Sequence, residues 1–197
     1  MATKKTLRLI LGDQLNSEHS WYKIPDKSVT YVLMEIRTET DYATHHIQKV
    51  VGFFAAMQQF AGELRAKKHQ VIYIYLNDKN NLQTFDKNIT ELITNQKFTN
   101  FEYQLPDEYR VDKHLNDFCK TLTIQTHVVD SEHFLSTRTE LGDFFKGKKI
   151  FLMESFYRAM RKKHNVLMDG NQPLTGQWNY DKDNTKNYPL TINVHRL

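Results

Sequence analysis

Short apolar runs alternate along the chain with longer stretches in which apolar residues recur every three or four positions. The runs are rich in Val, Ile, Leu and Tyr, and several lack the strict alternation of a half-exposed strand. Continuous apolar runs of this length are typical of strands buried on both faces. They predict five strands, at residues 7–11, 30–36, 71–76, 99–104 and 124–129.

The longest helical pattern covers residues 45–68. One apolar stripe runs along it, formed by Val50, Phe53, Phe54, Met57 and Phe60. Further helices are expected at 85–96, 108–121 and 153–164. Alternating strands and helices of these lengths predict βαβ units. We therefore expect an α/β fold: a Rossmann-like, doubly wound, mainly parallel five-stranded sheet with helices on both faces.

The pattern changes after about residue 130, where no further strand is evident before the helix at 153–164. The segment that follows this helix is rich in Gly, Pro, Asn and Asp, which is typical of an exposed connection. We expect one α/β domain over residues 1–150, followed by a helix and linker over residues 151–197 that would lead into another domain.

Composition narrows the class of protein. With 40% hydrophobic residues, the chain of 197 residues can bury a core. Its single cysteine, Cys119, excludes an internal disulfide and a cysteine-bound cluster. No apolar stretch approaches the roughly 18 residues of a membrane span, and no signal peptide is evident. We expect a cytoplasmic protein without a membrane partner.

The net charge of +4 is unevenly distributed. Residues 138–164 contain eight Lys or Arg and three Asp or Glu, so this segment carries +5 and the remainder −1. Within it, Arg158, Arg161 and Lys162 follow the aromatic pair Phe156 and Tyr157. Cations beside aromatic residues suit contacts with a nucleic-acid backbone, and equally docking onto an acidic neighbouring domain. A solvated helix face is the third interpretation left open.

The turn after the first strand contains Gly12, Asp13 and Gln14. In a doubly wound sheet, ligands bind beyond the carboxyl ends of the strands, where the strand order reverses. Gly12 would allow close approach of the backbone, and Asp13 and Gln14 would offer hydrogen-bonding groups. The residues alone favour a ligand-binding loop and a structural turn equally.

A second polar group follows the second strand. Glu35 ends that strand, and His45 and His46 open the long helix with Lys49 one turn after His45. There is no H-x-x-x-H spacing and no cysteine partner, so we expect no metal site. A polar rim for an aromatic ligand is the favoured interpretation, and a buried, hydrogen-bonded histidine is the alternative.

Familiar catalytic signatures are missing. The sequence has no G-x-G-x-x-G after the first strand, no Walker A loop and no G-x-S-x-G elbow. Its carboxylates suggest no catalytic pair, and no catalytic residue is predicted.

Three segments together resemble the photolyase-related proteins of bacteria, a group that includes the iron–sulfur bacterial cryptochromes and photolyases and the bacterial six-four photolyases. These segments are LRLILGDQL, MEIRTETDYATHHIQKVVGFFAAMQQFAGELR and MESFYRAMRKKHNVLMDGNQPLTGQWNYDKDN. The resemblance extends to about Asn184, and the final TINVHRL departs from it. With the doubly wound rule, it implies the strand order 3-2-1-4-5.

The resemblance also implies a function. In that family an N-terminal α/β domain binds an antenna chromophore, dimethyl-ribityllumazine or a related flavin-like molecule. A larger helical C-terminal domain binds FAD and a four-iron cluster. This chain matches the first part, so we expect a light-harvesting antenna domain that alone lacks photolyase activity, with FAD and the cluster in the part not matched. The positions matching the family's antenna pocket are Gly12, Asp13, Gln14, Leu15, Glu35, His45, His46 and Lys49.

Two other functions stay open. The chain could be a freestanding small-molecule-binding or regulatory protein of the same fold, or a nucleic-acid-binding module that uses its basic helix. DNA is an expected partner in the full-length context. The apolar residues near Phe156, Tyr157 and Trp178 would lack their usual cover, so we expect either a homodimer through this interdomain surface or a poorly ordered segment after about Asp169.

Overall fold

The computed structural model describes residues 4–181. The chain forms two compact units, which divide between His133 and Phe134. The division into an antenna domain over residues 1–150 and a linker over 151–197 stays a prediction, and residues 182–197, with the divergent TINVHRL, lie outside the described residues.

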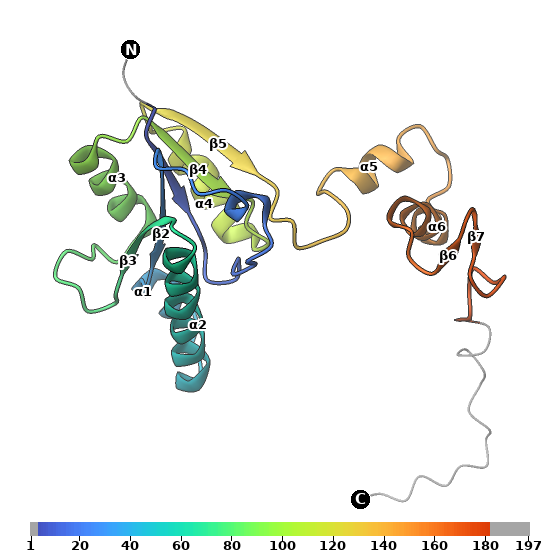
Figure 1. Cartoon of the computed structure of the whole chain (residues 1–197), viewed down its shortest axis with the longest axis horizontal. Coiled ribbons are helices and arrows are strands. Elements are labelled where there is room, and N and C mark those ends of the chain that lie inside the picture. The colour runs from blue at the N-terminus through green and yellow to red at the C-terminus, as the bar shows by residue number, and fades with distance from the viewer. Residues whose placement is uncertain (1–3, 182–197) are drawn as a thin grey trace, which may run out of the picture. The chain divides into compact units, whose positions relative to one another are not determined.

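The first unit is built on a five-stranded sheet in which every neighbouring pair is parallel (Figure 1). The strand order is β3-β2-β1-β4-β5, which confirms the predicted fold class and strand order. The strands are β1 (Thr6–Leu9), β2 (Val29–Met34), β3 (Gln70–Ile74), β4 (Asn100–Gln104) and β5 (Gln125–Val129). Each lies within two residues of its predicted start and end.

Helices cover both faces of the sheet. Helices α3 (Phe85–Gln96) and α4 (Tyr109–Cys119) pack on one face, against an apolar cluster that includes Val32 and Met34 of β2. Helix α2 (Ile47–Ala66) packs on the other, where Tyr31 and Leu33 of the same strand are buried. Because alternate residues of β2 enter different cores, the strand is buried along its whole length.

A loop completes the second face beside α2. It contains the 3-10 turn η1 (Ser20–Tyr22), and both Trp21 and Tyr22 are buried there. His19 holds the turn, since its Nδ1 accepts from the amide of Trp21 at 3.1 Å and its Nε2 lies 3.0 Å from the carbonyl oxygen of Asp130. An aromatic loop therefore covers sheet surface that α2 leaves open.

Side-chain caps stand at the starts of helices α2 and α3. His46 precedes α2 and its Nδ1 accepts from the amide of Gln48 at 3.2 Å, while Thr84 caps α3 through the amide of Lys87. A short helix, α1 (Arg37–Thr40), links β2 to the approach of α2. No helix within residues 4–181 is long and apolar enough to cross a membrane.

Within residues 134–181, the second unit contains two helices and a small hairpin. Helix α6 (Met153–His164) has its predicted bounds, whereas α5 (Glu140–Phe145) was not predicted from the sequence. Strands β6 (Met168–Asp169) and β7 (Gln172–Pro173) pair antiparallel. Part of the segment expected to be an open connection thus has a defined turn.

Candidate functional site

A cavity of about 220 Å³ lies at the carboxyl edge of the sheet, entirely within the first unit. Its walls come from the segments that follow β1, β2 and β4, together with the first half of α2 and the starts of α3 and α4. This is the edge at which doubly wound sheets bind ligands, beside the point where the chain crosses from one side of β1 to the other.

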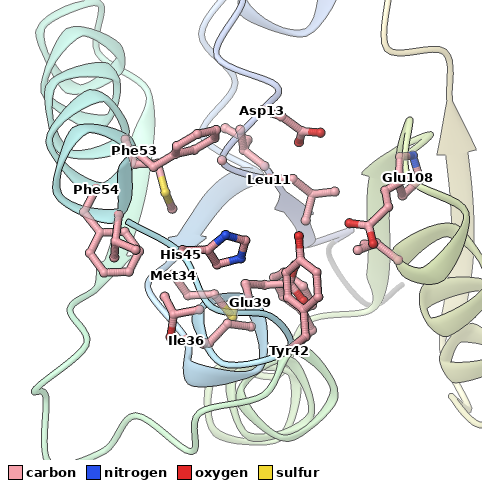
Figure 2. A pocket seen from close by; sticks show the side chains of 18 of the residues that line it. Leu11, Asp13, Met34, Ile36, Glu39, Tyr42, His45, Phe53, Phe54 and Glu108 are labelled. Atoms are coloured by element: carbon pink, nitrogen blue, oxygen red, sulfur yellow. The ribbon is translucent and has the colours of Figure 1, made fainter. Parts of the chain in front are cut away.

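The interior of the cavity is apolar. Figure 2 shows the rings of Phe53 and Phe54 on the α2 side and Glu108 on the opposite side, with His45 between them. Buried aliphatic and aromatic side chains form much of the remaining wall. They include Ile10, Leu11, Met34, Ile36, Met57 and Phe85. An apolar slot with polar groups at its mouth is the usual form of a small-molecule site.

Gly12 keeps the cavity open at the end of β1. A Cβ at this position would lie 3.1 Å from the sulfur of Met57 and 3.5 Å from the Cδ1 atom of Phe53. The first distance is tighter than ordinary van der Waals contact. The missing side chain therefore lets the loop after β1 approach α2 closely.

Charged and polar side chains form the rim, among them Asp13, Glu39, Tyr42, Lys49 and Glu108. Arg110 joins two of these carboxylates. It donates to Glu39 at 2.9 and 2.8 Å and to Glu108 at 2.8 Å, and its guanidinium lies 4.2 Å from the centre of the Tyr42 ring. The bond to Glu39, more than any other contact, raises the pKa of Arg110 and keeps it charged. Arg110 thus holds α1 and the start of α4 together across the rim.

Asp13 lies in an acidic part of this rim. Its side chain keeps partial access to solvent, but loss of water around the carboxyl raises its pKa above the ordinary value of 3.8. The charges of Asp107 and Glu108 act in the same direction, while His133 opposes them. His133 is engaged by Asp107, with 2.8 Å between Nδ1 and Oδ2.

Four of the residues predicted from the sequence line the cavity: Gly12, Asp13, His45 and Lys49. They come from the loop after β1 and from the start of α2. The ammonium group of Lys49 lies 5.9 Å from the centre of the Phe53 ring, so this cation borders the apolar wall.

The other four predicted residues lie outside the cavity wall, and two of them hold the sheet edge together. Gln14 is buried, and its amide nitrogen donates to the carbonyl oxygens of Gln104 and Leu105, each at 3.2 Å. Its side-chain oxygen accepts from the amide of Leu11 at 3.2 Å. Gln14 therefore joins the end of β1 to the end of β4 and shapes the turn that carries Gly12.

Glu35 has a similar supporting position. Its Oε1 atom accepts from the Tyr73 hydroxyl at 2.7 Å and from Gln58 at 2.8 Å, and Oε2 accepts from the amide of Leu76 at 2.9 Å. The carboxylate is buried and ties β2, β3 and α2 to one another. Burial, followed by the bond to Glu35, raises the pKa of the Tyr73 hydroxyl well above its ordinary value.

Leu15 and His46 complete the predicted set. Leu15 packs against the aromatic core beneath α2, and His46 is the cap of α2 described above. Their contacts in the structure are with the protein's own core and backbone.

Several residues of the site were missed from the sequence. Glu39 and Tyr42 precede α2, and Glu108 stands where the fourth strand leads into α4. A signal for Glu108 was present, since it follows a predicted strand at the same sheet edge as Gly12. Glu39 and Tyr42 lie in a segment without clear periodicity, and only the path of the chain brings them to the rim.

The basic residues predicted on α6 are largely engaged within their own unit. Arg161 is 6% exposed and donates to the carbonyl oxygens of Val166 and Leu167 at 3.1 and 2.6 Å. Arg158 donates to Glu154 at 3.1 Å. Arg158, Arg161 and Lys162 all lie 5.3–5.5 Å from the centre of the Trp178 ring. These cations hold Trp178 against α6.

Comparison with known proteins shows which family the chain belongs to. The family model of the deoxyribodipyrimidine photo-lyase-related proteins matches residues 8–196. The chain belongs to this family. The match spans both compact units, and the family resemblance seen in the sequence is confirmed. In the part of the chain that the structure describes, no group of three or more His, Cys, Asp or Glu residues could hold a metal ion.

Two relatives show how this family member compares in length. A (6-4) photolyase of Agrobacterium fabrum is 36% identical over 179 residues, which is 90% of this chain and 35% of the photolyase. The chain thus spans about a third of that relative. An uncharacterized protein of Acanthamoeba polyphaga mimivirus is 25% identical over 197 residues, covering 95% of this chain and 97% of the viral protein.

Proposed function

We propose that the first unit is the antenna-chromophore-binding domain of a photolyase-related protein. The observation that carries this proposal is the cavity at the carboxyl edge, with an apolar slot between Phe53 and Phe85 and a rim that includes Asp13 and His45. The family gives the light-harvesting context, and the cavity gives a place for the chromophore.

The size and apolar lining of the cavity suit a small ring system. A volume of about 220 Å³ is smaller than the roughly 300–1,000 Å³ of sites that enclose a whole drug-sized ligand. A flat heteroaromatic ring would fill the slot against Phe53 and Phe54, and its polar tail would lie at the rim. Dimethyl-ribityllumazine or a related flavin-like chromophore has this form.

The rim offers hydrogen-bonding groups for such a ligand. His45 and Lys49 can donate to ring carbonyl oxygens, and the carboxylate of Asp13 can accept from ribityl hydroxyls. Repair chemistry would belong to an FAD- and cluster-bearing domain, so the proposed activity of this chain is chromophore binding without photolyase activity.

A fluorescence titration with dimethyl-ribityllumazine and with riboflavin tests the proposal. Phe53→Ala removes one wall of the slot and should weaken binding by about tenfold, since burying one aromatic side chain contributes on the order of 1.5–3 kcal/mol. Phe134→Ala removes a phenyl ring from an exposed position in the second unit and should leave the affinity unchanged. Failure of the wild-type chain to bind either molecule at micromolar protein would refute the antenna function.

A freestanding ligand-binding or regulatory protein of the same fold is the second candidate. It is favoured by the mimivirus relative, of which 97% is matched by this chain, because that relative has about the size of the two units alone. Absorbance separates the two functions. The antenna function requires a ligand with a near-ultraviolet or violet band beyond the absorption of Trp and Tyr, whereas tight binding only of a colourless ligand would support the second candidate.

A further inference from the structure

The charges around the cavity differ from those of a nucleotide site. In many doubly wound sheets, a phosphate group binds at the helix that starts directly after the first strand, where free amides and the helix dipole attract it. Here β1 leads into Gly12 and Asp13, and the first helical turn that follows is the 3-10 turn at Ser20. A carboxylate stands where a phosphate would be attracted.

Helices α2 and α4, which both begin beside the cavity, are also poorly suited to phosphate. At the start of α2, the amide of Gln48 is bound by the His46 side chain, and the amides of Lys49 and Val50 are bound by the His46 carbonyl oxygen. Helix α4 begins directly after Glu108 and carries Asp112 in its first turn. One helix start has engaged amides, and the other is bordered by carboxylates.

The charge balance of the rim is negative. The carboxylates of Asp13, Glu39 and Glu108 line it, against the single lysine Lys49. Arg110 binds Glu39 and Glu108. When Arg110 is counted together with Lys49 and the three carboxylates, the rim still carries one net negative charge. The charge of Asp107 also acts on Asp13, and His133, which Asp107 binds, acts in the opposite direction. Because the cavity is smaller than sites that enclose a whole ligand, we expect the tail of a ligand to end among these groups.

We propose that the pocket selects unphosphorylated heteroaromatic ligands, and that Asp13 is the residue that excludes the phosphate ester of the same ligand. This inference rests on the proposed function. Like charges brought together at a binding site oppose association, and the carboxyl of Asp13 already lies near Asp107 and Glu108. Lys49 is the single lysine that lines the cavity, and its charge is outnumbered by those of the three carboxylates.

Matched ligand pairs test the inference in the full chain. Riboflavin is compared with FMN, and dimethyl-ribityllumazine with its 5′-phosphate, because the members of each pair differ only by one phosphate. At low ionic strength, the wild-type chain should bind the unphosphorylated member about tenfold more tightly. Asp13→Asn should reduce the ratio to about threefold or less by strengthening binding of the ester, with little effect on the parent compound.

Asp117→Asn is the matched control. It makes the same change of charge on α4, at an exposed site that is paired with Lys113 and Lys120 and lies outside the cavity wall. The discrimination should stay at the wild-type ratio. An equal effect of both substitutions would assign the discrimination to net charge and overturn the role of Asp13.

Salt dependence gives a test that needs no variant. If repulsion excludes the ester, its affinity for the wild-type chain should rise as salt screens the rim, while binding of the parent compound stays constant. Weaker binding of the ester at higher salt would overturn the inference. If both members bind equally, the inference falls and the chromophore site stands. If neither parent compound binds, the proposed function fails and the inference falls with it.

Discussion

The two halves of helix α2 share one apolar periodicity, but their apolar side chains face different parts of the protein. In the second half, Phe60, Ala61 and Leu64 are buried, with Leu64 fully enclosed against the sheet. Met57, at the boundary between the halves, is buried and also lines the cavity. In the first half, Ile47 is 68% exposed and Val51 59% exposed, while the residues turned toward the sheet edge border the cavity. One helix thus contributes both to the core and to the ligand site.

The difference follows from what each half faces. The second half packs on the strands themselves, against residues such as Tyr31 and Leu33. The first half faces the segments beyond the strand ends, where Gly12 and Ile36 lie. Loops do not fill space as a sheet does, so apolar side chains there enclose a cavity. Stability and ligand binding should therefore separate along α2.

The largest expected effect is on stability, in the second half. Leu64→Ala should lower the free energy of unfolding by about 2–5 kcal/mol, because it removes a fully buried side chain and leaves a void. Chemical denaturation followed by circular dichroism measures the loss. Chromophore affinity of the folded protein should change little, and a loss of affinity without a loss of stability would contradict the comparison.

The next largest expected effect, also on stability, is at Glu35, which binds α2 near the junction of its two halves. Glu35→Ala leaves the buried Tyr73 hydroxyl and the amide of Leu76 without their acceptor, so unfolding should become easier by about 1–3 kcal/mol. Glu35→Gln, which keeps an acceptor oxygen, should lose less. A normal denaturation midpoint with abolished chromophore binding would instead make Glu35 a direct ligand contact.

A pair of glycines tests the comparison within one type of substitution. Gly12→Ala places a methyl group 3.1 Å from the Met57 sulfur and should weaken chromophore binding by roughly fivefold or more, as overpacking at a filled site costs about 1–3 kcal/mol. Gly62→Ala, in the second half of α2, meets open space and should stabilise the helix by about 0.5–1 kcal/mol. Titration and thermal denaturation of both variants provide the readout. Equal effects on affinity would remove the special position of Gly12.

The smallest effect concerns Asp13 and pH. Its pKa is raised in the folded protein, so the folded state binds this proton more tightly than the unfolded state does. The contribution of Asp13 to the free energy of unfolding is therefore fully present below its ordinary pKa of 3.8. That contribution is lost as pH rises through the higher pKa that Asp13 has in the folded protein. Asp13→Asn should remove this part of the pH dependence, so that the variant gains stability relative to wild type as pH rises. Thermal midpoints measured from pH 3 to pH 7 test this, and a variant that loses stability relative to wild type over that range would reverse the sign.

The sequence predicted at which edge of the sheet the site lies better than it predicted which side chains line the cavity. Gly12 and Asp13 line the cavity because the loop after the first strand of a doubly wound sheet borders the ligand crevice whatever its neighbours are. Gln14 and Glu35 lie at the same edge, but their side chains turn into the protein. Their partners include Leu105 and Tyr73, which are distant in the sequence, so no local pattern could show this.

The sequence by itself determined the features that depend on interactions between residues close together in the chain. Apolar runs specify the five strands, of which β1, β2 and β4 are buried along most of their length while β5 at the sheet edge is largely exposed. Apolar spacing specifies α2, α3 and α4, with side-chain caps at the starts of α2 and α3, since these features depend on neighbours a few residues apart. The tertiary structure alone decided which apolar residues of α2 enter the core and which enclose a cavity. It also decided that Arg110 joins Glu39 to Glu108, segments about 70 residues apart. Those outcomes depend on where the strands end in space and on pairings between distant side chains, which periodicity along the chain does not contain.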